Sequence, residues 1–174
     1  MAREPVQAAS RYVNALDGLV ARPARPEDVE EISLLSAPFV DDGLLIARPL
    51  VELAEKMHEF VVARQEGRLV GCMGMAPTDT PTDKSLVVYN LCIAPDWQGR
   101  GIGRHLVGVA VNIGRREGYQ SLLALTRYGG EWFRKLGFSN VPVSEARDEW
   151  RTLFRPDRRS SLYRLILTSE QSRD

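Results

Sequence analysis

The chain has 174 residues, a length that fits one domain with a sizeable core, and 44% of the residues are hydrophobic. Its 23 basic and 23 acidic residues give a net charge of zero, so no global field draws the chain to nucleic acid or to an anionic membrane. No apolar stretch resembles a signal peptide or a bilayer span. We therefore expect a cytoplasmic globular protein without a nucleic-acid or membrane partner.

The histidines and cysteines do not form a metal-binding pattern. The two histidines, His58 and His105, lack ligand spacing, which argues against a zinc or iron enzyme. Cys72 and Cys92 lie in apolar runs and are too few for a disulfide framework. We expect both cysteines to be small buried hydrophobes, and we expect no metal cofactor.

Residues 1–17 differ from the rest of the chain. Their apolar residues recur at helical spacing, which predicts a short helix, and a mobile extension is an equally good interpretation. The part that follows predicts a strand, two helices and a hairpin, over 19–24, 26–40, 49–58 and 60–73. The hairpin turn contains Gly67, which suits a positive φ.

The second half of the chain alternates strands and helices. A polar loop over 77–83 leads into a strongly apolar strand over 85–94, which we expect to be central. The later elements are a long helix, a strand, a short helix, an irregular or helical stretch and a last strand, over 101–117, 121–125, 131–136, 150–154 and 161–167. The pattern indicates one layered α/β domain, with a mixed, mostly antiparallel central sheet flanked by helices.

The segment 98–104 joins the central strand to the long helix and is the most informative part of the sequence. It holds three alternating glycines, Gly99, Gly101 and Gly103, which let backbone amides turn toward a ligand. Amides at the positive end of a helix bind phosphate without a cationic side chain. A Walker loop and a dinucleotide fingerprint both require other spacings, so neither explains the segment.

Residues 98–103, Gln-Gly-Arg-Gly-Ile-Gly, follow a strand and a proline and resemble the acetyl-CoA pyrophosphate loop of the GNAT (GCN5-related) N-acetyltransferases. The Ala-Arg-Pro-Ala stretch at 21–24, the hairpin and the Trp-Phe-Arg-Lys-Leu-Gly-Phe stretch at 132–138 occur in the order expected of that family. The resemblance implies three parts: an N-terminal extension, an acetyltransferase domain and a C-terminal tail, over 1–17, 18–168 and 169–174.

The resemblance also implies acetyl-CoA as co-substrate and no metal. Loop amides would hold the pyrophosphate, and the strand before the loop would lie along the pantetheine arm and thioester. Two arginines would either add charge to the phosphates or remain solvated. The implied cofactor-binding residues are Leu91, Cys92, Ile93, Gln98, Gly99, Arg100, Gly101, Ile102, Gly103 and Arg104.

A narrower resemblance, to the acetyltransferase part of bacterial N-acetylglutamate synthases, implies an amino-acid substrate. Four stretches align with motifs of those enzymes: 43–48, Lys84, 125–127 and 157–160. L-Glutamate carries two carboxylates, which arginine forks and lysines hold well. The implied substrate-binding residues are Arg48, Lys84, Arg127, Arg158 and Ser160.

The general acid and base are less clearly indicated. An amine must lose a proton before it attacks a thioester, yet the tyrosine that many relatives use as the acid is replaced by Phe133. Tyr89 lies on the central strand, where it either orients a water or belongs to the core. Thr126 and Tyr128 lie near the expected thiol end. We take Tyr89, Thr126 and Tyr128 as the catalytic candidates.

Three functions stay open. The first is acetyl transfer from acetyl-CoA to the α-amino group of a small amino acid, with L-glutamate as first choice, as in arginine biosynthesis. The second is the same reaction on another amine, such as a peptide N-terminus or a metabolite, which acidic Asp41, Asp42 and Glu131 would favour. The third is a non-catalytic module that binds acyl-CoA. The resemblance further suggests a homodimer paired through a strand edge.

Overall fold

The structure, a computed structural model, describes residues 12–13, 17–79, 84–145 and 159–167. The chain divides into two compact units: unit 1 comprises 1–75 and 90–109, and unit 2 comprises 76–89 and 110–174. Three elements pass from one unit into the other: β4 (Arg68–Asp79), β5 (Lys84–Ile93) and α3 (Ile102–Arg116).

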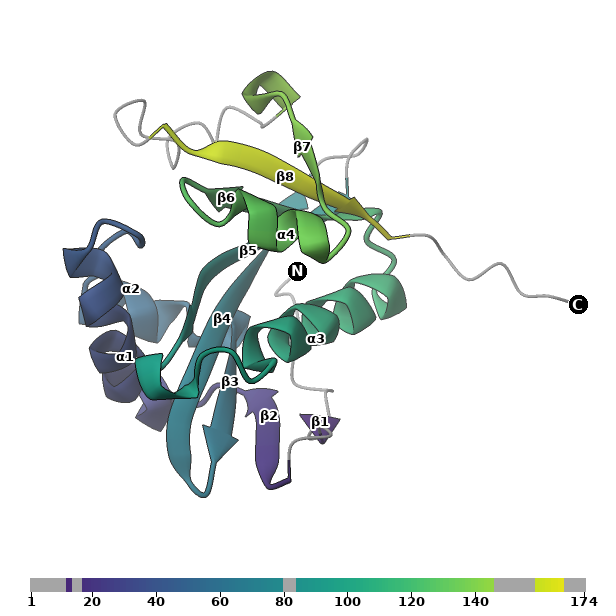
Figure 1. The fold of residues 1–174 in the computed structure, drawn as a ribbon. Helices are drawn as coiled ribbons and strands as arrows, with labels where there is room; N and C mark the ends of the chain where they lie inside the picture. The colour runs from purple at the N-terminus through teal and green to yellow at the C-terminus, as the bar shows by residue number, and fades with distance from the viewer. Residues whose placement is uncertain (1–11, 14–16, 80–83, 146–158, 168–174) are drawn as a thin grey trace, which may run out of the picture. The chain divides into compact units, whose positions relative to one another are not determined.

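Unit 1 is built on antiparallel strands in the order β1-β2-β3-β4 (Figure 1). Leu19 pairs with Gln65, and Phe60 pairs with Gly74. Its remaining elements, in chain order, are β1 (Tyr12–Val13), β2 (Leu19–Pro23), η1 (Pro26–Asp28), α1 (Val29–Asp41), α2 (Leu50–Glu55), η2 (Met57–Glu59), β3 (Phe60–Gln65) and η3 (Pro95–Trp97). The hairpin between β3 and β4 turns at Glu66 and Gly67, whose φ values of 49° and 82° match a tight two-residue turn.

Helices cover both faces of β4 in unit 1, as two consecutive residues show. Gly71 faces α3: a Cβ atom there would lie 2.8 Å from Cδ1 of Ile93 and 3.3 Å from a side chain of α3. Cys72 points to the other face. Its sulfur lies 3.5 Å from that of Cys92, which is 3.7 Å from the Ser36 hydroxyl on α1. Within unit 1, α3 and α1 therefore lie on opposite faces of the sheet.

A buried carboxylate ties the start of α1 to the strands of unit 1. The two oxygens of Asp28 accept four hydrogen bonds of 2.7–2.9 Å, from both terminal nitrogens of Arg22, from Arg64 and from the Arg25 amide. Burial by itself raises the pKa of Asp28, but these hydrogen bonds outweigh it and hold the pKa at about 2. Arg64 also pairs with Glu31. We call these residues the Asp28 cluster.

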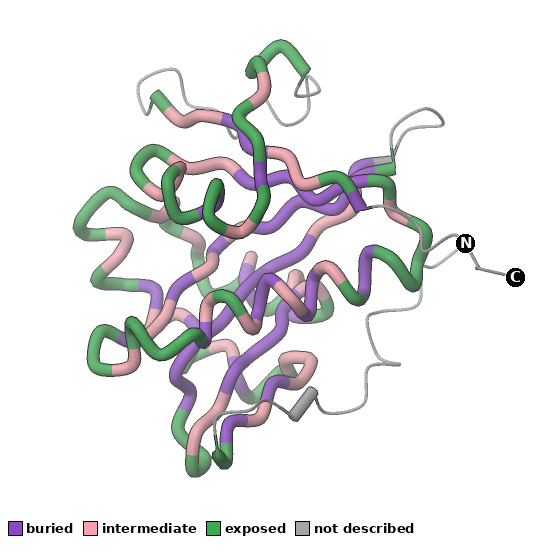
Figure 2. Tube along the Cα trace, turned by 45° about the vertical axis from the view of Figure 1, so that its right-hand side comes forward, coloured by how far each residue is buried: buried purple, intermediate pink, exposed green. Residues whose placement is uncertain are grey.

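Unit 2 contains the parallel pair β5–β6, and β8 and β7 follow in antiparallel pairing. Its further elements are β6 (Ser121–Thr126), α4 (Gly130–Lys135), β7 (Ser139–Val141), η4 (Val143–Glu145) and β8 (Ser161–Ile166). Its strands meet in an apolar cluster around Val87, Leu123 and Leu162. Figure 2 shows that buried positions follow the strands and one face of α3.

Most predicted elements are confirmed, including the mixed, mostly antiparallel strand pairing and the crossover from β5 through α3 to β6. Three expectations require correction. Tyr12–Val13 is a short strand, not part of a helix. β4 continues to Asp79, where a polar loop was expected from Pro77. β7 had no counterpart among the predicted elements. The stretch 150–154 lies outside the described residues.

Candidate acetyl-CoA and substrate site

The glycine loop leaves β5 and ends in α3, all within unit 1. Ala94 donates its amide to the Val70 carbonyl at 2.9 Å, which ties the start of the loop to β4. Gly99 and Gly101 have φ values of 74° and 84°, a region that favours glycine. A Cβ atom at either glycine would meet nothing within 4 Å. The loop is therefore open on the side of these two positions, and α3 begins at Ile102 directly after it.

The amides of this loop fit an anion. Helix α3 has 15 residues, and the first amides of a helix lack partners inside it. In the part of the chain that the structure describes, no acceptor is found for the backbone amides of residues 99–104. The helix dipole adds positive potential at the same place. Backbone geometry alone thus provides a site that suits the pyrophosphate of a nucleotide cofactor.

The polar side chains of the loop mainly brace the loop itself. Gln98 donates its side-chain amide to the Ile93 carbonyl at 3.1 Å, and Arg100 donates to the Asp96 carbonyl at 3.2 Å. The Arg100 guanidinium also lies 4.5 Å from the centre of the Trp97 ring. Arg104, one turn into α3, is exposed. A phosphate contact by Arg100 or Arg104 therefore stays a prediction.

The last three residues of β5 differ in how far their side chains are buried. Leu91 and Ile93 are half-buried, whereas Cys92 is 3% exposed and points toward Cys72 and α1. The contact with Cys92 and complete burial raise the pKa of the Cys72 thiol well above its ordinary value, so it stays protonated. Both cysteines are free and buried, as the sequence predicted. Cys92 can reach a cofactor along the strand only through its backbone.

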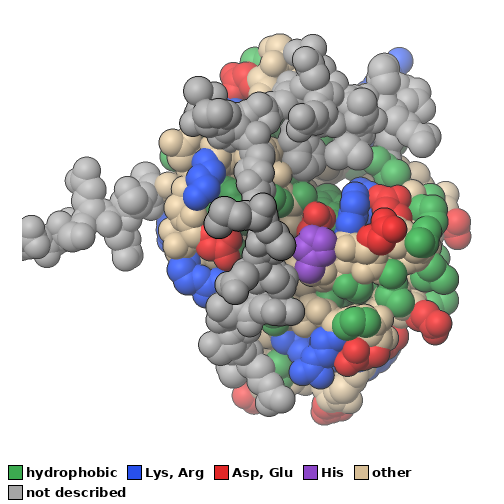
Figure 3. All heavy atoms as spheres, turned by 180° about the vertical axis from the view of Figure 1, so that it is seen from behind, with side chains coloured by type: hydrophobic (Ala, Val, Ile, Leu, Met, Phe, Trp, Pro, Cys, Tyr) green, Lys and Arg blue, Asp and Glu red, His purple; other side chains and the backbone are tan. Residues whose placement is uncertain are grey.

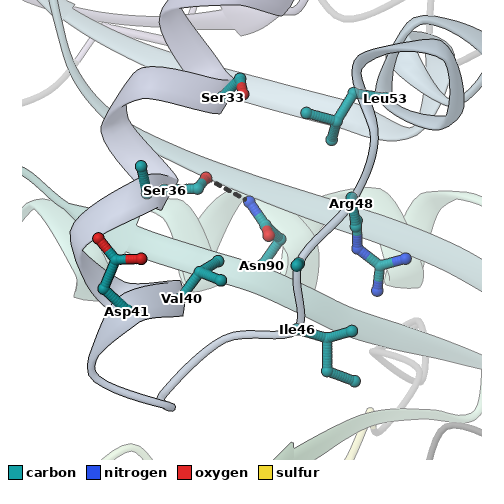
Figure 4. A pocket seen from close by; sticks show the side chains of 10 residues that line it. Ser33, Ser36, Val40, Asp41, Ile46, Arg48, Leu53 and Asn90 are labelled. Carbon is teal, nitrogen blue, oxygen red and sulfur yellow. Dashed lines mark hydrogen bonds between the residues drawn. The ribbon is translucent and has the colours of Figure 1, made fainter.

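A pocket of about 180 Å³ opens beside this strand end, also within unit 1 (Figure 4). Its volume is about six times that of a water molecule in the liquid, which suits a small metabolite. The walls come from α1, the segment that follows it, the start of α2 and one residue of β5. The lining residues are Ser33, Ser36, Ala37, Val40, Asp41, Ile46, Ala47, Arg48, Leu53 and Asn90.

Arg48 is the predicted substrate residue that the structure places in this pocket. Its guanidinium donates to the Glu52 carboxylate at 2.7 Å, and its side chain is only 11% exposed. Burial raises the pKa of Glu52, yet the hydrogen bonds from Arg48 and Lys56 outweigh this effect and leave the pKa below its usual value. The pair holds the arginine in one orientation at the pocket wall.

Two polar residues of the pocket were missed by the sequence analysis. Asn90 on β5 has a φ of 49° and donates its side-chain amide to the Ser36 hydroxyl at 3.0 Å (Figure 4). Ser36 donates in turn to the Ile32 carbonyl at 2.8 Å. Cys72 and Cys92 contact these two side chains, and we call the four residues the Asn90 cluster. Its signal in the sequence was an asparagine inside an apolar strand, since asparagine is depleted in strands and enriched at positive φ.

The other predicted residues belong to unit 2, and Lys84 has partners within it. Lys84 donates to the Glu117 carbonyl at 2.9 Å and lies 5.2 Å from the centre of the Tyr119 ring, at the end of α3. Tyr89 and Ser160 are half-buried. Arg158 lies outside the described residues. A role of these residues on substrate remains a prediction.

The candidates after β6 form a local turn. The Thr126 hydroxyl accepts the Gly129 amide at 2.7 Å, which is a structural bond of that turn. Tyr128 is 64% exposed, and the Arg127 guanidinium lies 4.9 Å from the centre of its ring. Phe133, which occupies the position of the missing tyrosine, is buried in contact with the rings of Trp132 and Phe138. It packs as core, and it has no proton to transfer.

Three further features bear on other ligand classes: the charges on one face, possible metal ligands and helix hydropathy. Figure 3 shows basic and acidic side chains interspersed on the face that it presents. No group of three or more potential metal ligands is found among the residues that were placed. Within the same residues, no helix is long and apolar enough to cross a membrane.

Comparison with known proteins agrees with this geometry. Residues 56–140 match the acetyltransferase (GNAT) domain family. The amino-acid acetyltransferase of Vibrio cholerae is 27% identical over 84% of this chain and 32% of its own length. The chain therefore spans about a third of the length of such relatives.

Two solved structures resemble this chain over most of its length. N-acetylglutamate synthase from Neisseria gonorrhoeae, complexed with coenzyme A and N-acetyl-glutamate, has a TM-score of 0.80 and 27% identity over 86% of this chain and 35% of that one. A Mycobacterium tuberculosis protein in complex with CoA has a TM-score of 0.70 and 25% identity over 86% of this chain and 99% of that one. Residues 56–140 thus match the GNAT acetyltransferase family, and the chain has the fold of these acetyltransferases.

Proposed function

We propose that the chain transfers the acetyl group of acetyl-CoA to the α-amino group of a small amino acid, with L-glutamate as the first choice. One observation carries this proposal: an open cradle of backbone amides and a small pocket that contains Arg48 adjoin the same end of β5. The likeness to proteins named amino-acid acetyltransferases and to a synthase solved with N-acetyl-glutamate supports the choice of an amino acid.

The residues of the site would hold two reactants side by side. Acetyl-CoA supplies the activated acetyl group when its pyrophosphate is held by amides 99–104. Arg48 would bind a substrate carboxylate, because a buried and oriented guanidinium matches that group. The amine nitrogen then gives its lone pair to the acetyl carbon, and the C–S bond breaks with its electrons on sulfur. The proton lost from nitrogen balances the proton that the thiolate takes up. Placement of the amine would supply much of the rate.

The first test measures CoA release from acetyl-CoA with L-glutamate, glutamine, aspartate and lysine, beside a reaction without amine. We expect turnover with glutamate that falls at least tenfold in Arg48→Ala. Lys56→Ala is the matched control, because Lys56 also pairs with Glu52 but does not line the pocket. Stabilisation by acetyl-CoA without turnover of any amine would contradict the proposal and favour a binding module.

A second candidate substrate is a cationic amine, and one residue favours it. Asp41 lines the pocket and brings a negative charge that repels a second substrate carboxylate. Preference for lysine or a lysine-bearing peptide over glutamate in the same assay would select this candidate. Loss of that preference in Asp41→Asn would show that this pocket residue determines it.

A further inference from the structure

We propose that Asn90 receives the substrate amino group, with its side-chain carbonyl oxygen accepting an N–H of the amine and holding the nitrogen for acetyl transfer. The inference rests on the proposed function and adds to it the group that positions the nucleophile. The observation that carries it is the carbonyl oxygen of a pocket-lining residue, to which no described residue donates a hydrogen bond.

The orientation of the Asn90 carboxamide follows from its neighbours. The Ser36 hydroxyl uses its one hydrogen on the Ile32 carbonyl at 2.8 Å, so it can only accept from Asn90. The amide nitrogen must therefore face Ser36, at 3.0 Å, and it also points at the Cys72 sulfur at 3.8 Å. Both N–H bonds are thus directed at protein atoms. The carbonyl oxygen, at the other end of the planar carboxamide, has neither of these contacts.

That oxygen differs from the rest of the side chain. Asn90 as a residue is 8% exposed, and its Oδ1 is not one of the fully buried unpaired atoms, so this oxygen keeps some accessible surface. Among the residues that the structure describes, none donates a hydrogen bond to Asn90 Oδ1. Since Asn90 lines the pocket, the acceptor is directed at the space where a small ligand would bind (Figure 4).

The backbone places this acceptor at a useful position. A φ of 49° is unusual for a strand residue and turns the Asn90 side chain to the α1 side, beside Ser36. From Asn90 to Ile93 the strand advances about 10 Å, at the usual rise per strand residue. The chain then continues into the glycine loop. The amine acceptor and the phosphate cradle thus belong to one continuous segment.

A neutral acceptor suits the chemistry of an amine nucleophile. A carboxylate in this place would stabilise the ammonium form, which has no lone pair for attack. A carboxamide oxygen accepts an N–H but carries no charge, so it orients the amine with a smaller effect on its pKa. The carboxamide takes up no proton in the step; that proton leaves to water. Asn90 therefore touches the substrate as a positioning group and not as a general base.

The main variant is Asn90→Gly, because glycine accepts the positive φ and removes only the carboxamide. We expect KM for the amino acid to rise about tenfold, as loss of one oriented hydrogen bond predicts, while KM for acetyl-CoA stays within twofold. Glu66→Gly is the matched control, since Glu66 has the same φ of 49° in the β3–β4 turn and lines no part of the pocket. It should leave both constants unchanged.

Asn90→Asp allows a measurement that would not change if Asn90 had only a structural role. The new carboxylate stabilises the ammonium form of the bound substrate, so the rising limb of kcat against pH should move up by roughly one unit or more. Titration of the amino acid into the protein saturated with CoA adds a binding measurement. It should show weaker binding in Asn90→Gly and retained binding in Asn90→Asp.

The outcomes distinguish a failure of the Asn90 proposal from a failure of the proposed function. A wild-type protein that acetylates no amino acid overturns the proposed function, and the role of Asn90 falls with it. A wild-type protein that does so, with Asn90→Gly equal to Glu66→Gly in KM, kcat and binding, overturns the role of Asn90 alone. An unchanged pH profile in Asn90→Asp would likewise contradict contact between this residue and the amine.

Discussion

The two buried polar clusters of unit 1 differ in how completely their atoms are paired. Both oxygens of Asp28 accept two hydrogen bonds each, so the carboxylate has no acceptor capacity left for a ligand. Asn90 uses both N–H bonds and leaves its carbonyl oxygen toward a pocket. A fully paired buried group contributes to stability, whereas a group with one atom left over at a pocket is available for binding. The predictions below test that distinction.

Removing the Asp28 charge should cause the largest loss of stability. In Asp28→Asn, Arg22 and Arg64 lose the carboxylate that neutralises them while remaining about 16–17% exposed. Breaking a buried ion pair costs about 3–5 kcal/mol, and the partial exposure of the arginines favours the lower end. Urea unfolding measures the effect. Glu31→Gln removes a half-exposed partner of Arg64 and should cost less than about 1 kcal/mol. Equal losses in the two variants would contradict the importance of burial.

Acid should weaken the protein through the same carboxylate. The pKa of Asp28 is about 2 in the folded protein, below its ordinary value of 3.8, so the carboxylate stabilises the fold above about pH 4. This contribution, about 2 kcal/mol, is lost as the pH falls from 4 toward 2. Unfolding free energies across this range should decline less steeply in Asp28→Asn. If both proteins show the same slope, other carboxylates control the acid response.

The glycine loop and the Asn90 cluster differ in how far the sequence revealed them. The glycine loop is contiguous, so its chemistry could be recognised from residues 98–104 alone. The Asn90 cluster joins residues 54 positions apart, and the positive φ that turns Asn90 toward Ser36 has no local motif. Arg48 was found through a motif, but its contact with Glu52 depends on where α2 begins. Site contacts between residues that are distant in the sequence could therefore be identified only from the structure.

The errors in the fold have similar causes. Pro77 predicted a loop because proline donates no ladder hydrogen bond. In the structure the Thr78 hydroxyl bonds both the amide and the carbonyl of Ser85, at 3.0 and 2.9 Å, and ties β4 to β5. β7 has three residues and pairs with β8, which lies twenty residues further along the chain. Elements this short are determined by tertiary pairing and carry little local signal.

Ser36→Ala should moderately lower both the stability of the protein and its activity on the amino acid. The variant leaves the Asn90 amide without its main acceptor, and an unpaired buried donor costs about 1–2 kcal/mol. The released carboxamide can rotate, so we expect kcat/KM for the amino acid to fall several-fold. Ser33→Ala is the matched control, since Ser33 lines the pocket on the same helix and its hydroxyl makes no hydrogen bond to a described residue. Lost stability with full activity would show that the orientation of Asn90 does not matter.

The smallest effect is expected at Cys92, which belongs to the same cluster but offers no group to the pocket. Its sulfur contacts Cys72 and Ser36, and the residue is 3% exposed. Truncation in Cys92→Ala removes one buried atom, for which about 1 kcal/mol of stability is a reasonable loss, and acetyl transfer should stay within twofold of the wild type. Cys72→Ala should behave alike, because its thiol is buried in the same way. A large loss of activity in Cys92→Ala alone, together with an acetylated cysteine trapped during turnover, would instead point to transfer through the thiol. Direct attack of an amine held by Asn90 requires neither sulfur. Equal and near-normal rates in both variants would therefore show that, within this cluster, the carboxamide and not the thiols contributes to function.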